Sequence, residues 1–327
     1  MPKKIIVTGG CGFIGHHVVQ HFYKNTDWDI VIFDKLTYAS CGLQRLRDLD
    51  LLNNERIKTF TIDLSNGIEE GIKMEIGNDV ELIMHLAAET HVDSSILNPK
   101  LFIENNIMST FTMLEYSKTL PNLKCFFYFS TDEVFGPAPL GTAYKEWDRH
   151  KPTNPYSASK SAAENICISY ENTYKTPVLI VNVMNAFGER QHQEKFIPNT
   201  IRKVLNGEKV IIHCDTNKVP GSRFYIHARN IAQALLFLLE NGKIGEKYNI
   251  VGEKEVNNLE LAQFIAKTLG KELDYELVDF HSTRPGHDLR YSLDGTKMAA
   301  MGWKLPVNFE ESLEKTIRWT VDNNKWL

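Results

Sequence analysis

The chain has 327 residues, of which 43% are hydrophobic and 24% are charged, and its formal net charge is −4 at pH 7. A chain of this size and composition can bury a large core and forms one large domain or two closely packed ones. The slightly acidic balance, without a dense run of lysine and arginine, argues against a nucleic-acid or membrane-surface partner. The first apolar run starts at Ile5, and no apolar stretch reaches the roughly 18 residues that cross a bilayer, so we expect neither a signal peptide nor a membrane span.

The placement of cysteine and histidine gives no sign of a disulfide framework or a metal site. The five cysteines are odd in number, widely spaced and in no CxxC pair. This pattern is typical of free thiols in a reducing compartment, which points to the cytoplasm. His17 and His21 are four residues apart on a predicted helix, but no third ligand stands near them, so we expect no bound metal.

Strand-like and helix-like segments alternate through the first half of the chain. The predicted strands are apolar almost throughout, which indicates burial on both faces and hence a parallel sheet covered by helices. The strands cover residues 5–9, 29–34, 57–63, 82–88, 124–131, 177–185 and, late in the chain, 246–252; the clearest helices cover Phe13–Lys24, Pro99–Leu120 and Pro155–Tyr174. This order predicts an α/β fold with a doubly wound parallel sheet of the Rossmann type.

The segment VTGGCGFIG joins the first predicted strand to the first predicted helix. Gly9 permits a tight turn, Gly12 lets the backbone approach a pyrophosphate, and Gly15 allows close packing of helix against strand. The positive end of the helix then faces the phosphates. A purely structural glycine-rich turn is the alternative, but the strand before it and the helix after it favour a dinucleotide site.

Acids at the ends of the next strands refine the choice of cofactor. Asp34 ends the second strand, where a carboxylate accepts hydrogen bonds from the ribose hydroxyls and repels a 2′-phosphate, so NAD is favoured over NADP. Asp63 ends the third strand and is placed to reach the adenine amino group. The other residues that we assign to the NAD site lie in the glycine turn or at the ends of the second, third and fourth strands: Phe13, Ile14, Lys35, Leu64, Leu86, Ala87 and Ala88.

The pattern of elements becomes looser and richer in turns after Gly188. We therefore expect residues 1–187 to form the NAD-binding Rossmann domain. Residues 188–327 are expected to form mainly a smaller C-terminal substrate-binding lobe, with 225–252 returning to the Rossmann sheet.

The segment TNPYSASK begins a helix that carries a tyrosine and a lysine. Asn154 is placed as the N-cap and Pro155 as the first helical residue. Tyr156 and Lys160 are four residues apart and therefore share one helix face. A nearby cation favours the phenolate, so Lys160 is predicted to lower the pKa of Tyr156. This spacing is common by chance, but next to a dinucleotide motif it indicates a functional pair.

Two adjacent acids follow the fifth predicted strand in FSTDEVFG, residues 129–136. Neighbouring carboxylates at the end of a buried strand are costly to desolvate, and each raises the pKa of the other. Taken alone, Thr131, Asp132 and Glu133 also fit a solvated loop with an N-capping aspartate. On these residues alone, the loop and a catalytic site both stay open.

Together, the glycine turn, the Tyr-x-x-x-Lys spacing and the chain length are similar to the extended, nucleotide-sugar branch of the short-chain dehydrogenase/reductase family. Within that branch the chain closely resembles the dTDP-glucose 4,6-dehydratases, nearly from end to end. The Asp-Glu pair after Thr131 is the most specific feature. The segments that carry the resemblance are DKLTYAS (34–40), HLAAETHVDSSI (85–96), STDEVFG (130–136), NPYSASK (154–160), EKFIP (194–198) and RPGHDLRY (284–291).

The resemblance implies an NAD-dependent lyase of deoxysugar biosynthesis, which dehydrates an NDP-glucose (dTDP- or UDP-glucose) to the NDP-4-keto-6-deoxy-glucose. It implies that Tyr156, aided by Thr131 and Lys160, takes the proton of the sugar O4 while C4 gives a hydride to NAD. Glu133 then removes the C5 proton and Asp132 protonates the departing C6 hydroxyl. The stored hydride finally returns to C6.

The same resemblance assigns a set of residues to the nucleotide sugar: His91, Asn185, Glu194, Lys195, Arg223, Arg284 and His287. Arg223 matches an arginine that clamps the pyrophosphate, as the guanidinium geometry suits. The chain departs from the pattern at Phe224, where an acid is usual, and at Asn182, where an arginine is common. We expect both changes to lie near the nucleotide end of the substrate, so they leave open whether the nucleotide is dTDP or UDP.

Two other functions remain in competition. A nucleotide-sugar 4-epimerase shares Tyr156 and the cofactor but gives Asp132 no role. A non-catalytic dinucleotide-binding sensor is expected to lose Tyr156 or Lys160, and both are present. The resemblance also implies a homodimer through a four-helix bundle, to which apolar residues of the helix at 99–120 contribute.

Overall fold

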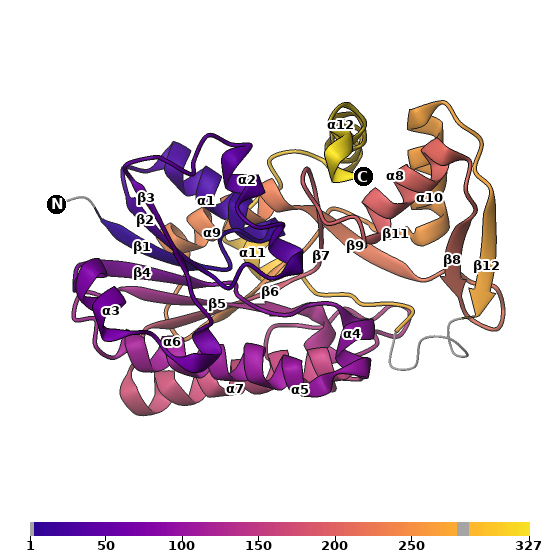
Figure 1. The fold of residues 1–327 in the computed structure, drawn as a ribbon. Coiled ribbons are helices and arrows are strands. Elements are labelled where there is room, and N and C mark those ends of the chain that lie inside the picture. Colours follow the sequence, from indigo (N-terminus) through magenta and orange to yellow (C-terminus); the bar gives the residue numbers. More distant parts are fainter. Residues whose placement is uncertain (1–2, 280–287) are drawn as a thin grey trace.

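A seven-stranded parallel sheet forms the centre of the larger part of the molecule (Figure 1). The computed structural model describes residues 3–279 and 288–327. The strand order is β10-β6-β5-β4-β1-β2-β3, so the chain changes direction between β1 and β4, where doubly wound sheets bind their ligands. The strands are β1 Lys4–Thr8, β2 Asp29–Asp34, β3 Ile57–Thr61, β4 Val80–His85, β5 Cys125–Thr131, β6 Val178–Val183 and β10 Lys247–Ile250. The predicted doubly wound parallel sheet is confirmed.

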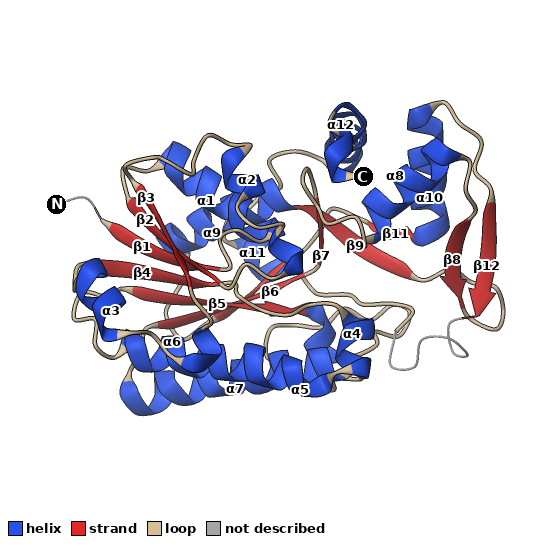
Figure 2. Ribbon diagram, viewed as in Figure 1, coloured by secondary structure: helices blue, strands red, loops and turns tan. Residues whose placement is uncertain are grey.

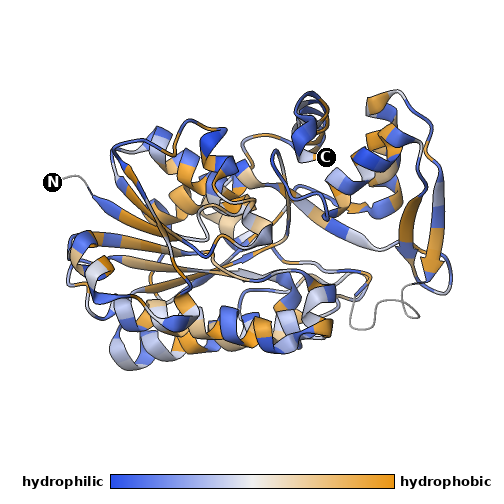
Figure 3. Cartoon of the chain, in the orientation of Figure 1, coloured by the Kyte–Doolittle hydropathy of each residue, from blue (hydrophilic) through white to orange (hydrophobic). Residues whose placement is uncertain are grey.

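Helices cover both faces of this sheet (Figure 2). On one face lie α1 (Phe13–Asn25), α2 (Gln44–Arg47), α9 (Ala228–Asn241) and α11 (Thr296–Ala300); on the other lie α3 (Glu70–Ile76), α4 (Val92–Leu97), α5 (Pro99–Phe102), α6 (Ser109–Ser117) and α7 (Pro155–Tyr174). Successive residues of β1 point to opposite faces. Ile5 belongs to a buried cluster with Val18 of α1, whereas Ile6 belongs to a second buried cluster with Met113 of α6. The apolar strands are therefore buried on both sides (Figure 3).

The helix predicted over Pro99–Leu120 is interrupted. After α5 the backbone forms a π-helical turn at Ile103–Met108 before α6 begins. Asn106 lies in this turn and is buried; its side chain accepts a hydrogen bond from the Glu89 backbone N–H (2.8 Å) and donates one to Ser159 Oγ (2.9 Å). The wider turn ties the loop after β4 to α7, and π-turns of this kind often mark functional sites.

In the residues that the structure describes, the smaller part of the molecule contains two short sheets and three α-helices (Figure 1). The single strand predicted at 177–185 is two strands in the structure. Its first part, β6, belongs to the main sheet, and the residues that follow form β7 in a sheet of the smaller part. The elements are β7 Asn185–Phe187, β9 Ser222–His227 and β11 Glu255–Asn257 in one sheet, β8 Val210–Cys214 and β12 Tyr275–Asp279 in the other, with α8 Phe196–Asn206, α10 Asn258–Leu269 and α12 Phe309–Asp322. Late in the chain, β10 pairs in parallel with β6 at the edge of the main sheet.

All five cysteines are unpaired. Among the described residues, no helix combines the length and apolar character needed to cross a bilayer. Over the same residues, we find no group of three or more His, Cys, Asp or Glu side chains that is placed to hold a metal ion.

Candidate active site

A cavity of about 650 Å³ runs along the carboxyl edge of the main sheet and into the smaller part of the molecule. Parallel strands end at the same edge, so residues far apart in the sequence converge there. The cavity is lined by every predicted site residue that the structure describes. Arg284 and His287 lie outside the described residues.

The glycine turn between β1 and α1 has the shape that a dinucleotide requires. Gly9 has a positive φ of 70°, and a Cβ there would stand 2.9 Å from the backbone nitrogen of Ala87. A Cβ on Gly15 would stand 2.0 Å from the carbonyl oxygen of Gly9. Gly12 is the N-cap of α1, whose N-terminal N–H groups suit a phosphate. Side chains would close this cradle, so the glycines fit the pyrophosphate of NAD.

The two acids assigned to adenosine also hold the protein's own backbone. Asp34 is buried, and its carboxylate accepts hydrogen bonds from the Cys11 N–H (2.9 Å) and the Leu36 N–H (2.8 Å). Burial raises its pKa, and these two bonds oppose that shift. Asp63 pairs with Lys35 (2.6 Å) and accepts a hydrogen bond from the Ser65 N–H (3.0 Å). Each carboxylate therefore shapes the cavity wall as well as facing it.

Thr131, Asp132 and Glu133 lie where β5 passes into a 3₁₀ turn at Asp132–Phe135. The Thr131 side chain caps this turn and donates a hydrogen bond to Asp132 Oδ1 (3.0 Å). Asp132 Oδ2 is buried and has no hydrogen-bond partner among the described residues. A buried carboxylate oxygen without a partner is costly, so the alternative of a solvated loop is wrong.

The two acids have different surroundings. Burial, followed by the charge of Glu133, raises the pKa of Asp132 to about 7. Burial also raises the pKa of Glu133, but hydrogen bonding by Asn154 and the charge of Arg223 oppose that shift. The Asn154 amide donates to Glu133 Oε2 at 3.2 Å. Asp132 is therefore suited to hold a proton near neutral pH, and Glu133 is better supported as a carboxylate.

Tyr156 and Lys160 share the inner face of α7, and both are buried. The predicted lowering of the Tyr156 pKa by Lys160 is wrong for the protein's own side chains. Burial and the charges of Glu133 and Asp132 raise the pKa of Tyr156, and only its hydrogen bond with Thr131 opposes them. The ammonium of Lys160 lies over the Tyr128 ring, 4.5 Å from the ring centroid, and burial lowers its pKa to about 8.

Arg223 lies on β9 at the far wall of the cavity. Its guanidinium donates to the carbonyl oxygens of Leu289 (2.6 Å) and Asp288 (2.6 Å) and lies 4.6 Å from the centre of the Tyr291 ring. These hydrogen bonds join β9 to the segment that follows residue 287. The guanidinium also donates to the carbonyl oxygen of Ser222 (2.7 Å), so two of its five N–H groups make no bond to the described residues.

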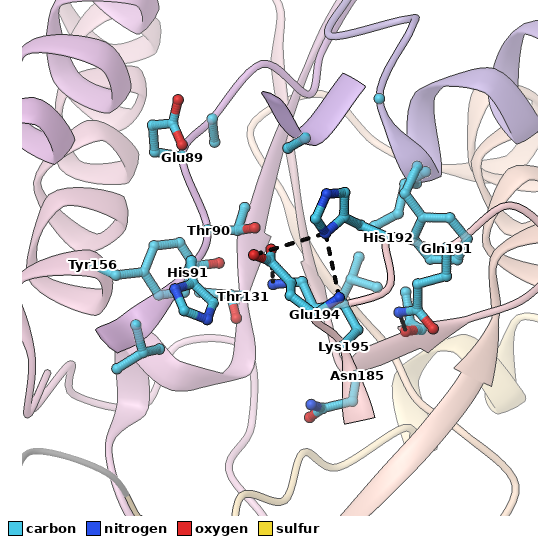
Figure 4. Close-up of a pocket in the computed structure, with 18 of the residues that line it drawn as sticks. Glu89, Thr90, His91, Thr131, Tyr156, Asn185, Gln191, His192, Glu194 and Lys195 are labelled. Atoms are coloured by element: carbon cyan, nitrogen blue, oxygen red, sulfur yellow. Dashed lines mark hydrogen bonds and ion pairs between the residues drawn. The ribbon is translucent and has the colours of Figure 1, made fainter. Parts of the chain in front are cut away.

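The segment before α8 contributes Gln191, His192, Glu194 and Lys195 to the wall of the cavity (Figure 4). Glu194 forms ion pairs with Lys195 (3.6 Å) and, when the imidazole is protonated, His192 (3.7 Å). The hydroxyl of Tyr38, which does not itself line the cavity, donates to Glu194 (3.5 Å), and its ring meets that of His192 edge-on. His91 caps α4, with its Nδ1 2.7 Å from Ser94 Oγ.

Comparisons of the sequence and the fold with known proteins show which family the chain belongs to. The family described as GDP-mannose 4,6 dehydratase matches residues 6–316. The chain belongs to this family. It is 36% identical to dTDP-glucose 4,6-dehydratase of Haemophilus influenzae, over 98% of both chains. It is 34% identical to dTDP-glucose 4,6-dehydratase 1 of Escherichia coli, over 99% of this chain and 94% of that one. The predicted resemblance to these enzymes is confirmed.

The chain is also similar to a solved structure and to part of a longer relative. The structure of DesIV, a dTDP-glucose 4,6-dehydratase from Streptomyces venezuelae with NAD and TYD bound, has a TM-score of 0.88 at 31% identity and covers 99% of this chain and 98% of that one. A trifunctional UDP-glucose 4,6-dehydratase/UDP-4-keto-6-deoxy-D-glucose 3,5-epimerase/UDP-4-keto-L-rhamnose-reductase of Arabidopsis thaliana is 35% identical over 99% of this chain. The chain spans only 48% of that relative's length.

Asn182, one of the departures from the 4,6-dehydratase pattern, lies in a different place from the one expected. Asn182 was expected near the nucleotide, but it is fully buried in β6 and does not line the cavity. Its amide donates to Asn249 Oδ1 on β10 at 3.1 Å. The expectation is therefore wrong for Asn182, which serves strand pairing.

The sequence did not single out several residues that line or support the dehydratase cavity. Tyr38 and Glu89 stood inside quoted motifs, but their spacing carried no signal of a site. His192 and Tyr291 come from turn-rich segments, and only the fold brings them to the cavity. Asn154 was expected only as a helix cap, and its second bond, to Glu133, depends on how α7 packs against β5.

Proposed function

We propose that this protein is an NAD-dependent NDP-glucose 4,6-dehydratase, which forms the NDP-4-keto-6-deoxy-glucose. The observation that carries the proposal is the adjacent pair of buried Asp132 and half-buried Glu133, which line the same cavity as Tyr156 and the glycine turn. Dehydration needs one group to remove the C5 proton and another to protonate the leaving hydroxyl. A 4-epimerase needs neither, so it leaves the buried pair without a role.

The residues act in sequence. Tyr156, with Thr131 beside it and Lys160 one turn further along α7, takes the proton of the sugar 4-hydroxyl. The 4-ketone that results acidifies the C5 hydrogen, and Glu133 removes it. Asp132 protonates the C6 hydroxyl, which leaves as water. NAD, when bound in the glycine cradle, would supply the acceptor for the C4 hydride and the donor of the same hydride to C6. A proton returns to C5 as the hydride reaches C6, which completes the 4-keto-6-deoxy sugar.

The pKa shifts support this division of work. An Asp132 with a pKa of about 7 carries a proton for part of the time at neutral pH, as a general acid must. Burial raises the pKa of Glu133, but the hydrogen bond from the Asn154 amide and the charge of Arg223 favour its carboxylate form, which suits the role of base. Burial and the charges of Glu133 and Asp132 raise the pKa of Tyr156. The positive charge of an oxidised nicotinamide would lower it and so favour the phenolate that takes the proton.

The nucleotide sugar is proposed to occupy the part of the cavity between the catalytic residues and the smaller part of the molecule. Arg223 and Asn185 then face its phosphates, and His91, Glu194 and Lys195 complete the wall. Arg284 and His287 keep their proposed roles as substrate ligands. The division into an NAD-binding domain at 1–187 and a substrate lobe at 188–327 follows from the same arrangement.

Assembly and location are further proposals. Ile103, Met108 and Phe111 are exposed apolar residues on the π-helical turn and α6. They support a homodimer through a four-helix bundle. The five free thiols support a reducing compartment, the cytoplasm.

The decisive experiment is incubation of the purified protein with dTDP-glucose and, separately, with UDP-glucose. Mass spectrometry is expected to show loss of one water, and alkali should develop the near-ultraviolet absorbance of a 4-keto-6-deoxy sugar. Formation of the 4-epimer without loss of water would establish the epimerase instead. NAD binding without turnover of either sugar would favour the sensor.

A further inference from the structure

A buried ion pair lies behind the catalytic residues and outside the cavity lining. The side chain of Glu164 is 0% exposed and that of Lys247 is 2% exposed, and Glu164 Oε1 lies 2.5 Å from Lys247 Nζ. Removing two charges from water is costly, and a buried ion pair seldom stabilises a fold more than apolar residues of the same size. The proposed reaction gives neither residue a role. Their position suggests one.

Glu164 joins the two elements that carry the catalytic groups. Its Oε2 accepts a hydrogen bond from Ser130 Oγ at 2.7 Å, and Ser130 directly precedes Thr131 on β5. Glu164 itself stands on α7, one turn after Lys160 and two turns after Tyr156. The carboxylate therefore ties the end of β5 to the helix that carries the tyrosine and the lysine.

His150 and Lys247 together hold Glu164 in its charged form. His150 Nε2 lies 3.3 Å from Glu164 Oε1, and its Nδ1 lies 2.8 Å from Ser161 Oγ on the same helix. Burial would raise the pKa of Glu164, but His150 and Lys247 outweigh burial and lower it. Glu164 is therefore a carboxylate at neutral pH.

The charged and titratable groups around Lys160 come from three elements. Tyr128 lies on β5 under the ammonium, His85 lies on β4, and Cys167 and Glu164 lie on α7 itself. Burial raises the pKa of both Tyr128 and Cys167 and lowers that of His85, so all three are neutral near pH 7. Glu164 is left as the anion among these groups.

We propose that Glu164 is a positioning residue of the active site, which fixes the end of β5 against α7 and keeps a negative charge beside Lys160. Lys247 makes that charge compatible with burial. A carboxylate near an ammonium favours its protonated form, so Glu164 extends the pH range in which Lys160 can assist Tyr156. This role rests on the proposed function.

The test separates packing from charge. Glu164→Gln keeps an acceptor for Ser130 but leaves Lys247 buried without its partner, so this variant is expected to lose stability. The double variant Glu164→Gln/Lys247→Met removes both charges and should recover most of the melting temperature. Glu246→Gln is the matched control, because it removes the partly exposed ion pair that Glu246, the residue before Lys247, makes with Lys297.

The kinetics and the titration of Lys160 are expected to depend on the charge of Glu164 and not on the stability of the variant. In the double variant, kcat with the turned-over NDP-glucose should fall by about 10- to 100-fold, the cost of slight misplacement of catalytic groups, with little change in KM. With a substrate that carries fluorine in place of the C6 hydroxyl, so that the leaving group needs no proton from Asp132, the alkaline limb of the double variant's pH profile should move down by about one pH unit, since Lys160 loses a neighbouring anion. Glu164→Asp keeps the charge and should keep the limb, and Glu246→Gln should match the wild type.

The second readout does not need turnover. In protein labelled with ¹³C at the lysine Cε, the Lys160 signal is assigned by its loss in Lys160→Met, and its titration gives the pKa directly. A lower Lys160 pKa in the double variant supports the proposal, and an unchanged pKa together with wild-type kcat would overturn it. If the wild type dehydrates no NDP-glucose, the proposed function fails, while the titration still decides whether Glu164 governs Lys160.

Discussion

The catalytic end of the cavity and the end assigned to the substrate phosphates are built in different ways. The catalytic side chains stand on the last residue of β5, the turn after it and the first turns of α7, and all except the half-buried Glu133 are buried. The phosphate end relies on a three-residue strand, a loop before α8 and an arginine held by backbone carbonyl oxygens.

The rigid end of the cavity thus holds the groups assigned to catalysis, and the less regular end holds those assigned to substrate binding. Buried groups on regular elements keep one geometry because neighbouring side chains leave no room for another. Loops and short strands accept substitution more readily, and binding specificity therefore changes there first. Phe224, on β9, stands where the resemblance leads one to expect an acid, but it packs against a buried cluster and does not line the cavity, so the expectation that it lies near the nucleotide is wrong.

The largest effects are expected from the two acids, because they are assigned to different protons. Glu133→Gln cannot remove the C5 proton, so NADH should appear in one stoichiometric burst and then stall, without solvent deuterium entering C5. Asp132→Asn keeps the base, so C5 exchange should continue while loss of the C6 hydroxyl slows by about 10²–10⁴-fold. Rapid-mixing absorbance and mass spectrometry measure both.

A substrate with fluorine in place of the C6 hydroxyl tests the assignment further, because its leaving group needs no proton. It should rescue Asp132→Asn and leave Glu133→Gln inactive. Rescue of the glutamate variant alone would reverse the two roles. Wild-type dehydration by both variants would make the pair structural and revive the epimerase.

Arg223→Ala should raise KM by about 10- to 150-fold, since a charge-assisted contact to phosphate contributes about 1.5–3 kcal/mol. Its melting temperature should also fall, because the carbonyl oxygens of Leu289 and Asp288 lose their donor. Arg223→Lys should keep part of the affinity. Arg318→Ala, on the exposed surface of α12, is the control. An unchanged KM in the alanine variant would remove Arg223 from the substrate site.

The pH dependence of dehydration should report Asp132. Its pKa of about 7 means that the protonated acid is lost as pH rises through that value, so kcat should fall about tenfold per pH unit above it. The fall should vanish with the 6-fluoro substrate and in Asp132→Asn. A limb that persists in both cases belongs to another group.

The smallest effect is expected at the cofactor. Asp34→Asn keeps a side-chain oxygen that can accept from the Cys11 or Leu36 N–H, but it removes the charge that repels a 2′-phosphate. We expect calorimetry to show that preference for NAD over NADP shrinks several-fold while NAD still binds. Equal affinities for both cofactors in the wild type would contradict the role of Asp34.

The local parts of the site could be predicted from the sequence because their signals are local. Gly9, Gly12 and Gly15 reflect backbone conformation and close approach, and Tyr156 and Lys160 reflect the helical repeat. The order of strands and helices predicted the parallel sheet for a similar reason, since burial on both faces leaves an apolar run in each strand. The sequence by itself thus determined the fold class, the cofactor turn and the residues at the catalytic edge.

Only the tertiary structure decided how distant segments meet. Asn182 was assigned to the nucleotide because sequence position cannot tell which face of a strand is covered, and β10 covers its side chain. The pKa of Tyr156 was predicted in the wrong direction because spacing along α7 cannot measure burial, which dominates that shift. The link from Ser130 through Glu164 to Lys247 joins three elements 117 residues apart from end to end. Such contacts depend on packing and long-range electrostatics, which a local sequence pattern does not contain.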